Sequence, residues 1–130
     1  LAGNALSMAA VRATLSEVLT DDAWDYTVPL ATRFSDGIKT VVEEFGLPWN
    51  VTQLGARAEY RFEGAPAGMG SQAHDSSDPV LVRYLHVHAL IRGVLITPFH
   101  NMALMSPATT EHDVDLHTEV FREAVSDLQS

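Results

Sequence analysis

A change in the spacing of apolar residues constrains the fold of this chain more than any other feature of its sequence. Between Tyr26 and Phe45 apolar residues recur at steps of three and four, which is typical of a helix with one buried side. Gly46 and Pro48 end this pattern, and strand-like residues follow over 51–62. A chain that has both the helical and the strand-like spacing of apolar residues is predicted to form helices that pack against a small sheet.

The first half of the chain predicts two helices. Asn4 is a suitable N-cap for a helix that ends near Thr20 and has one broad apolar side. Asp21 and Asp22 are expected to cap the second helix. Pro29 lies inside its pattern, so we expect a kink there or the true start of the helix.

The second half predicts short strands and two further helices. Residues 51–54 and 58–62 are expected to form strands joined at Gly55, and 94–96 a short buried strand. Residues 63–78 should form a surface loop, after which Asp78 and Pro79 start a third helix by the N-cap and N1 rule. Thr110 and Asp113 resemble a capping box that starts the last helix, whose expected inward residues are Val114, His117, Phe121, Ala124, Val125 and Leu128.

The fold class that follows is α/β, more closely an α+β small domain. We expect three or four largely antiparallel strands, covered by helices on one side and preceded by a connecting helix. The expected division is 1–20 for that connecting helix and 21–130 for the small domain.

Composition excludes several classes of protein. With 130 residues, 46% of them hydrophobic, the chain has enough apolar residues for one core, and it lacks the run of ~20 apolar residues that a membrane span needs. The net charge of −9, with only 8 Lys and Arg, argues against nucleic acid as a partner. The absence of Cys excludes disulfides and thiolate chemistry and agrees with a cytoplasmic protein. The chain begins with Leu1 rather than Met, so we expect that something upstream was removed.

Two segments carry a family resemblance. The first is Leu1-Ala-Gly-Asn-Ala-Leu-Ser-Met-Ala-Ala10, and the second is Gly93-Val-Leu-Ile-Thr-Pro-Phe-His-Asn-Met-Ala-Leu-Met-Ser-Pro-Ala-Thr-Thr110. They resemble the C-terminal third of class III (fold type I) pyridoxal-phosphate aminotransferases, in the branch of glutamate-1-semialdehyde aminomutases and β-phenylalanine aminotransferases. The chain opens just after the Thr that binds the cofactor phosphate in that family, and Ala5 replaces the usual Pro.

The resemblance implies pyridoxal 5′-phosphate as the cofactor, bound mainly by an upstream part of the protein. Gly3 and Asn4 would then support the phosphate site, whereas the residues alone favour a helix cap. The single lysine, Lys39, lies four residues before Glu43 on the polar side of a helix, as in an ordinary surface pair. The Schiff-base lysine is therefore expected outside this sequence, and the chain alone is not expected to be catalytic.

The segment Thr97-Pro-Phe-His-Asn-Met-Ala-Leu-Met105 is the candidate for substrate contacts. Phe99, Met102 and Met105 are suited to an apolar pocket, and His100 and Asn101 to hydrogen bonds with a carboxylate. The same residues fit equally well a purely structural role, in which they close the underside of the domain. Many members of the family carry a mobile Arg in this loop that binds the substrate carboxylate. This loop contains no Arg, and the nearest one upstream, Arg92, lies at the end of a predicted helix.

A metal site is not expected. His86 and His88 are two residues apart on a predicted helix, about 200° around its axis, so they cannot bind one ion together. His112 and His117 also face different ways.

The preferred interpretation is the C-terminal part of a homodimeric transaminase that moves an amino group between an amino acid and a 2-oxo acid. An aromatic β-amino acid is one candidate for the amino donor. One alternative is a part of a glutamate-1-semialdehyde 2,1-aminomutase. A second is a non-catalytic α/β module for binding or oligomerisation. The preferred interpretation also predicts an exposed apolar patch on the first helix.

Overall fold

A computed structural model describes residues 3–66, 68–71, 77–97 and 100–130 of the chain. Its regular elements are helix α1 (Ala5–Ala13), π-helix η1 (Thr14–Val18), helix α2 (Asp21–Glu44), strands β1 (Asn50–Leu54) and β2 (Arg57–Arg61), helix α4 (Pro79–Leu90), strand β3 (Met102–Leu104) and helix α5 (Glu111–Leu128). The three strands form one antiparallel sheet in the order β1-β2-β3. The predicted α+β class and largely antiparallel sheet are confirmed.

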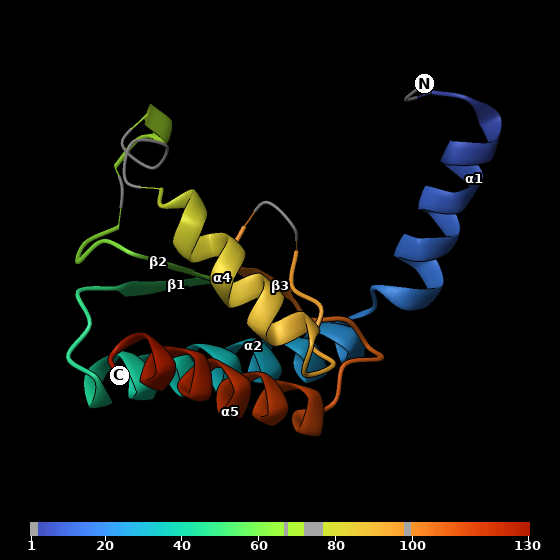
Figure 1. Ribbon diagram of the computed structural model, residues 1–130. Helices are drawn as coiled ribbons and strands as arrows, with labels where there is room; N and C mark the ends of the chain where they lie inside the picture. Colours follow the sequence, from blue (N-terminus) through green and yellow to red (C-terminus); the bar gives the residue numbers. More distant parts are fainter. Residues whose placement is uncertain (1–2, 67, 72–76, 98–99) are drawn as a thin grey trace.

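Helices cover one face of the sheet. Helix α2 packs against α5, β1 and β2, and α4 packs against α5 (Figure 1). The strands turn Ala58 and Tyr60 toward these helices, and neither residue is exposed to solvent. The other described members of the core are contributed chiefly by the helices: Leu30, Ala31, Phe34, Ile38, Val41, Val42, Ala56, Leu85, Met105, Val114, Phe121, Ala124 and Val125.

Most of the predicted helix ends are confirmed by local hydrogen bonds. The Asn4 side chain accepts from the Ser7 N–H at 2.9 Å, and Asp78 caps α4 with Pro79 as its first residue. Thr110 and Asp113 form both hydrogen bonds of the capping box at the start of α5. In each case a short polar side chain satisfies N–H groups that the first helical turn leaves without an intrahelical partner.

One prediction for α2 needs correction, and one of the two alternatives for Pro29 is excluded. Thr20, rather than Asp21 or Asp22, is the N-cap, and both aspartates lie inside the first turn, where their charges favour the positive end of the helix dipole. Pro29 does not start the helix, because α2 runs through it from Asp21 to Glu44. Gly46 has the expected positive φ of 62° just after the helix.

The predicted strand at 94–96 is wrong. Those residues form no regular element, and Leu95 is 81% exposed. The third strand is instead Met102–Leu104, which pairs with β2. Leu128, expected to be buried at the end of α5, is 47% exposed, whereas Val120 is buried.

Helix α1 and η1 project away from the rest of the molecule (Figure 1). None of their residues is buried, and Leu6, Met8, Val11, Leu15 and Val18 are each about half exposed or more. The expected apolar patch on the first helix is therefore present. None of the described helices combines the length and apolar character that crossing a membrane requires.

Candidate active site

The start of α1 is the candidate support for the cofactor phosphate. Gly3 is exposed, and a Cβ placed on it would meet nothing within 4 Å, so its backbone is open to an approaching group. Asn4 caps the helix and its amide donates to the Ser7 hydroxyl at 2.9 Å. The exposed backbone of this turn at a helix N-terminus is compatible with one wall of an anion site.

Lys39 does not have the surroundings of a cofactor lysine. It lies on α2, about half exposed, and its Nζ contacts Asp36 Oδ1 at 3.2 Å. The predicted partner Glu43 is thus replaced by Asp36, one turn back on the same helix. The single lysine of the chain is therefore engaged in a surface ion pair within α2.

The described end of the candidate substrate segment runs antiparallel beside β2, with Met102–Leu104 paired to Arg57–Glu59. Asn101 is buried; its Oδ1 lies 3.1 Å from His86 Nε2, and its carbonyl accepts from the Tyr60 N–H at 3.0 Å. His100 is exposed, with its Nδ1 3.7 Å from Glu59 Oε1. Met102 begins β3, and Phe99 lies outside the described residues.

An open cavity of about 340 Å³ lies beside this segment. Met102 and Met105 both line it, as the apolar-pocket hypothesis requires, together with Phe34, Ile96, Val114 and His117. His117 is buried, its ring centroid lies 4.6 Å from that of Phe34, and burial lowers its pKa to about 4. Its imidazole is therefore neutral at physiological pH.

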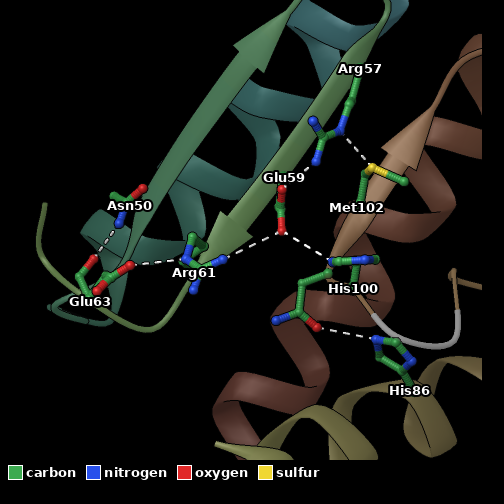
Figure 2. Close-up of polar contacts among 9 residues, drawn as sticks. Asn50, Arg57, Glu59, Arg61, Glu63, His86, His100 and Met102 are labelled. Carbon is green, nitrogen blue, oxygen red and sulfur yellow. Dashed lines mark hydrogen bonds and ion pairs between the residues drawn. The ribbon is translucent and has the colours of Figure 1, made fainter. Parts of the chain in front are cut away.

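A row of alternating charges follows the outer face of β2, and it was not among the sites expected from the sequence. Arg57 Nη2 donates to Glu59 Oε2 at 2.7 Å, and Arg61 Nε donates to Glu63 Oε1 at 2.9 Å (Figure 2). Arg61 Nη1 also lies 3.7 Å from Glu59 Oε1. The signal was present in the sequence, since successive charged residues at period two must share one face of a strand.

Arg92, the nearest arginine upstream of the loop, has other partners. Its Nε donates to Glu123 Oε2 at 2.8 Å, and its Nη1 donates to the His88 carbonyl at 3.3 Å. Arg57 reaches the loop, since its Nε contacts Met102 Sδ at 2.6 Å (Figure 2). Across the described segments, no group of three potential ligand side chains is arranged to hold a metal ion.

Comparison with solved structures identifies the class of fold. A glutamate-1-semialdehyde aminomutase of Pseudomonas aeruginosa, solved in complex with PMP, matches 97% of this chain with a TM-score of 0.92 and 45% identity, and the match covers 28% of that protein. The β-phenylalanine aminotransferase of Variovorax paradoxus matches 94% of this chain with a TM-score of 0.74 and 18% identity, a likeness of fold alone. The fold is that of the small domain of fold type I pyridoxal-phosphate enzymes.

The sequence relatives are more specific. The glutamate-1-semialdehyde 2,1-aminomutase of Thermus thermophilus is 33% identical over 128 residues, which cover 96% of this chain. The corresponding protein of Desulfitobacterium hafniense is 29% identical over 129 residues, which cover 98% of it. No protein-family model matches the chain. The chain is homologous to the C-terminal part of class III pyridoxal-phosphate-dependent aminotransferases, and it spans about 30% of the length of the curated relatives it matches.

Proposed function

We propose that this chain is the C-terminal part of a pyridoxal-phosphate-dependent enzyme that transfers an amino group between an amino acid and a 2-oxo acid. The observation that carries the pyridoxal-phosphate-dependent amino transfer is the match to the Pseudomonas aeruginosa aminomutase, solved in complex with PMP, at 45% identity over 97% of the chain. The only lysine is engaged on the surface of α2, which supports attachment of the cofactor to a lysine elsewhere in the protein. The described chain would then shape the cleft and bind substrate, and pyridoxal phosphate would supply the electron sink for amino transfer.

Within this proposal the site residues form two groups, one at the cofactor phosphate and one at the substrate. Gly3 and Asn4 would form the wall of the phosphate site with their backbone at the start of α1. Phe99, His100, Asn101 and Met102 would face the substrate, an assignment supported by the cavity that Met102 and Met105 line.

The division into a connecting helix over 1–20 and a small domain over 21–130 is part of the same proposal. The lack of any buried residue in α1 and η1 supports it, because an apolar helix in water needs a surface to cover it. We further propose that the enzyme is a cytoplasmic homodimer in which the large domain covers this helix.

An intramolecular amino transfer, as in glutamate-1-semialdehyde 2,1-aminomutase, is the second candidate. The names of the sequence relatives at 28% to 33% identity favour it. Transfer between two substrates is favoured by a segment that resembles the β-phenylalanine transaminases. This segment is Val94-Leu-Ile-Thr-Pro-Phe-His-Asn-Met-Ala-Leu104.

One experiment on the full-length protein separates these activities. The purified protein is examined for the visible absorbance of bound cofactor, then supplied either with 3-amino-3-phenylpropanoate and 2-oxoglutarate or with glutamate 1-semialdehyde. Formation of glutamate from the first pair supports the transaminase. Isomerisation of the semialdehyde alone supports the aminomutase, and a colourless protein inert with both contradicts the proposal.

A further inference from the structure

Arg57 has a guanidinium that is only loosely engaged. Its side chain is 45% exposed, and its partners among the described residues are Glu59 Oε2 at 2.7 Å and Met102 Sδ at 2.6 Å. A thioether is a weak hydrogen-bond acceptor, so Glu59 is its single strong partner within the described segments. The guanidinium N–H groups of Arg57 can therefore donate hydrogen bonds to a second carboxylate.

Glu59 does not depend on Arg57 alone. Its side chain is only 16% exposed, and Arg61 Nη1 and His100 Nδ1 each lie 3.7 Å from its Oε1 (Figure 2). A partly buried carboxylate is costly without a nearby cation, and Glu59 would keep the Arg61 guanidinium as such a neighbour if Arg57 turned away. Arg57 can thus exchange Glu59 for a ligand carboxylate without leaving a buried charge unpaired.

The surroundings of Arg57 on the open face of the sheet are apolar. The register aligns Leu54, Arg57 and Leu104 in one row across the three strands. Leu54 is 80% exposed and Leu104 is 66% exposed, although both are large apolar residues. A cation set between exposed leucines and beside a methionine suits a ligand that has a carboxylate and an apolar body.

The geometry points to Arg57 as the residue that binds the carboxylate of the substrate, with Met102 and Leu104 contacting the apolar part of that substrate. This inference rests on the proposed amino-transfer function and deepens it, because it names an amphipathic carboxylate as the substrate class. Arg57 would thereby supply the cation that the loop from Thr97 to Met105 lacks. Arg33 and Arg92 are bound to acidic residues of α5 instead.

The test compares two probes that differ only in charge. Isothermal titration calorimetry on the full-length holoenzyme measures the affinities of 3-phenylpropanoate and of 3-phenylpropanamide. We expect Arg57→Met to weaken binding of the carboxylate by about 10- to 100-fold, the usual range for loss of a charged hydrogen bond, and to leave binding of the amide unchanged. Arg57→Lys should retain part of the preference for the carboxylate over the amide, because Lys keeps the positive charge but cannot donate two parallel hydrogen bonds as a guanidinium can.

A matched control uses Arg33, which has a similar exposure of 46% and a bidentate carboxylate partner, Asp115. Arg33→Met should leave both affinities unchanged. Equal weakening of carboxylate and amide by Arg57→Met, or no weakening of either, would overturn the inference. Failure of the proposed function would appear separately, in a wild-type protein that binds no cofactor and transfers no amino group.

Discussion

Tyr60 and His117 line the same small void beneath the sheet, and neither Tyr60 Oη nor His117 Nδ1 has a hydrogen-bond partner among the described residues. Tyr60 belongs to β2 and His117 to α5, so the void lies where the sheet meets the helix layer. Both rings pack against Phe121, with centroid distances of 5.0 Å and 6.1 Å. The aromatic rings therefore stabilise the core, while their polar atoms add little to its stability.

The first prediction concerns the Tyr60 hydroxyl. Tyr60→Phe keeps the ring and removes a buried group without a described partner, so we expect the free energy of unfolding to change by less than about 1 kcal/mol or to rise. Tyr84→Phe is the matched control, because Tyr84 Oη donates to the Ala124 carbonyl at 3.0 Å. Its removal should cost about 1 kcal/mol in urea denaturation. A larger loss for Tyr60→Phe than for Tyr84→Phe contradicts the prediction.

The second prediction is a pH dependence that His117 causes. Burial lowers the pKa of His117 from its ordinary value of 6.5 to about 4 in the folded chain, so between these values the unfolded chain binds the extra proton. The free energy of unfolding should therefore fall as the pH falls through this window, by about 3 kcal/mol in total.

His117→Phe keeps an aromatic ring and removes the titrating group, so it should abolish this part of the pH dependence. The exposed His112, replaced by Gln, provides a control that should follow the wild type. Denaturation curves recorded at pH values between the folded and unfolded pKa of His117 test this prediction. Parallel pH profiles for the wild type and His117→Phe would show that His117 does not contribute.

The third prediction concerns the contact between α2 and α5. A Cβ on Gly37 would lie 2.5 Å from Thr118 Oγ1 and 3.0 Å from its Cγ2, so a larger residue here requires Thr118 or the helix spacing to shift. Gly37→Ala should destabilise the chain by about 1–3 kcal/mol despite the better helix propensity of Ala.

Thr118→Ala provides the test of this mechanism, because it removes both crowding atoms. In that background Gly37→Ala should cost much less, and a double-mutant cycle measures the difference as a coupling energy. Equal costs in the two backgrounds would rule out the clash as the cause.

The parts of the fold that were predictable from the sequence are those set by local chemistry. Asn4, Asp78 and the Thr110–Asp113 pair cap helices through bonds to residues two or three positions away. Gly55 turns β1 into β2 with a φ of 56°, as its place between two strand-like segments required. Such signals do not depend on the rest of the chain.

The third strand was not predictable in the same way. The apolar run Val94–Ile96 has the stronger strand composition, yet Met102–Leu104 pairs with β2. That choice depends on a pairing between residues far apart in the chain, Glu59 with Met102, which no local pattern reveals. The contact of Arg57 with Met102 follows from the same register, so the sequence indicated the loop residues as candidates but did not indicate Arg57 as their neighbour.

The last prediction separates a structural role of Asn101 from a substrate contact. The residue is 7% exposed, its Oδ1 is 3.1 Å from His86 Nε2, and its carbonyl accepts from Tyr60 at the end of β2. Its side chain therefore links the residue before β3 to α4, and the stability of Asn101→Ala tests whether this contact or the proposed substrate contact is its main role. Asn101→Ala should lower the free energy of unfolding by about 1–3 kcal/mol, because it removes a buried hydrogen bond and leaves a ring nitrogen of His86 without this partner. His86→Phe removes the same bond from the other side, so the two losses should be less than additive in a double-mutant cycle. In the full-length enzyme, a loss of substrate affinity without a loss of stability in Asn101→Ala would instead identify Asn101 as a direct ligand of the substrate.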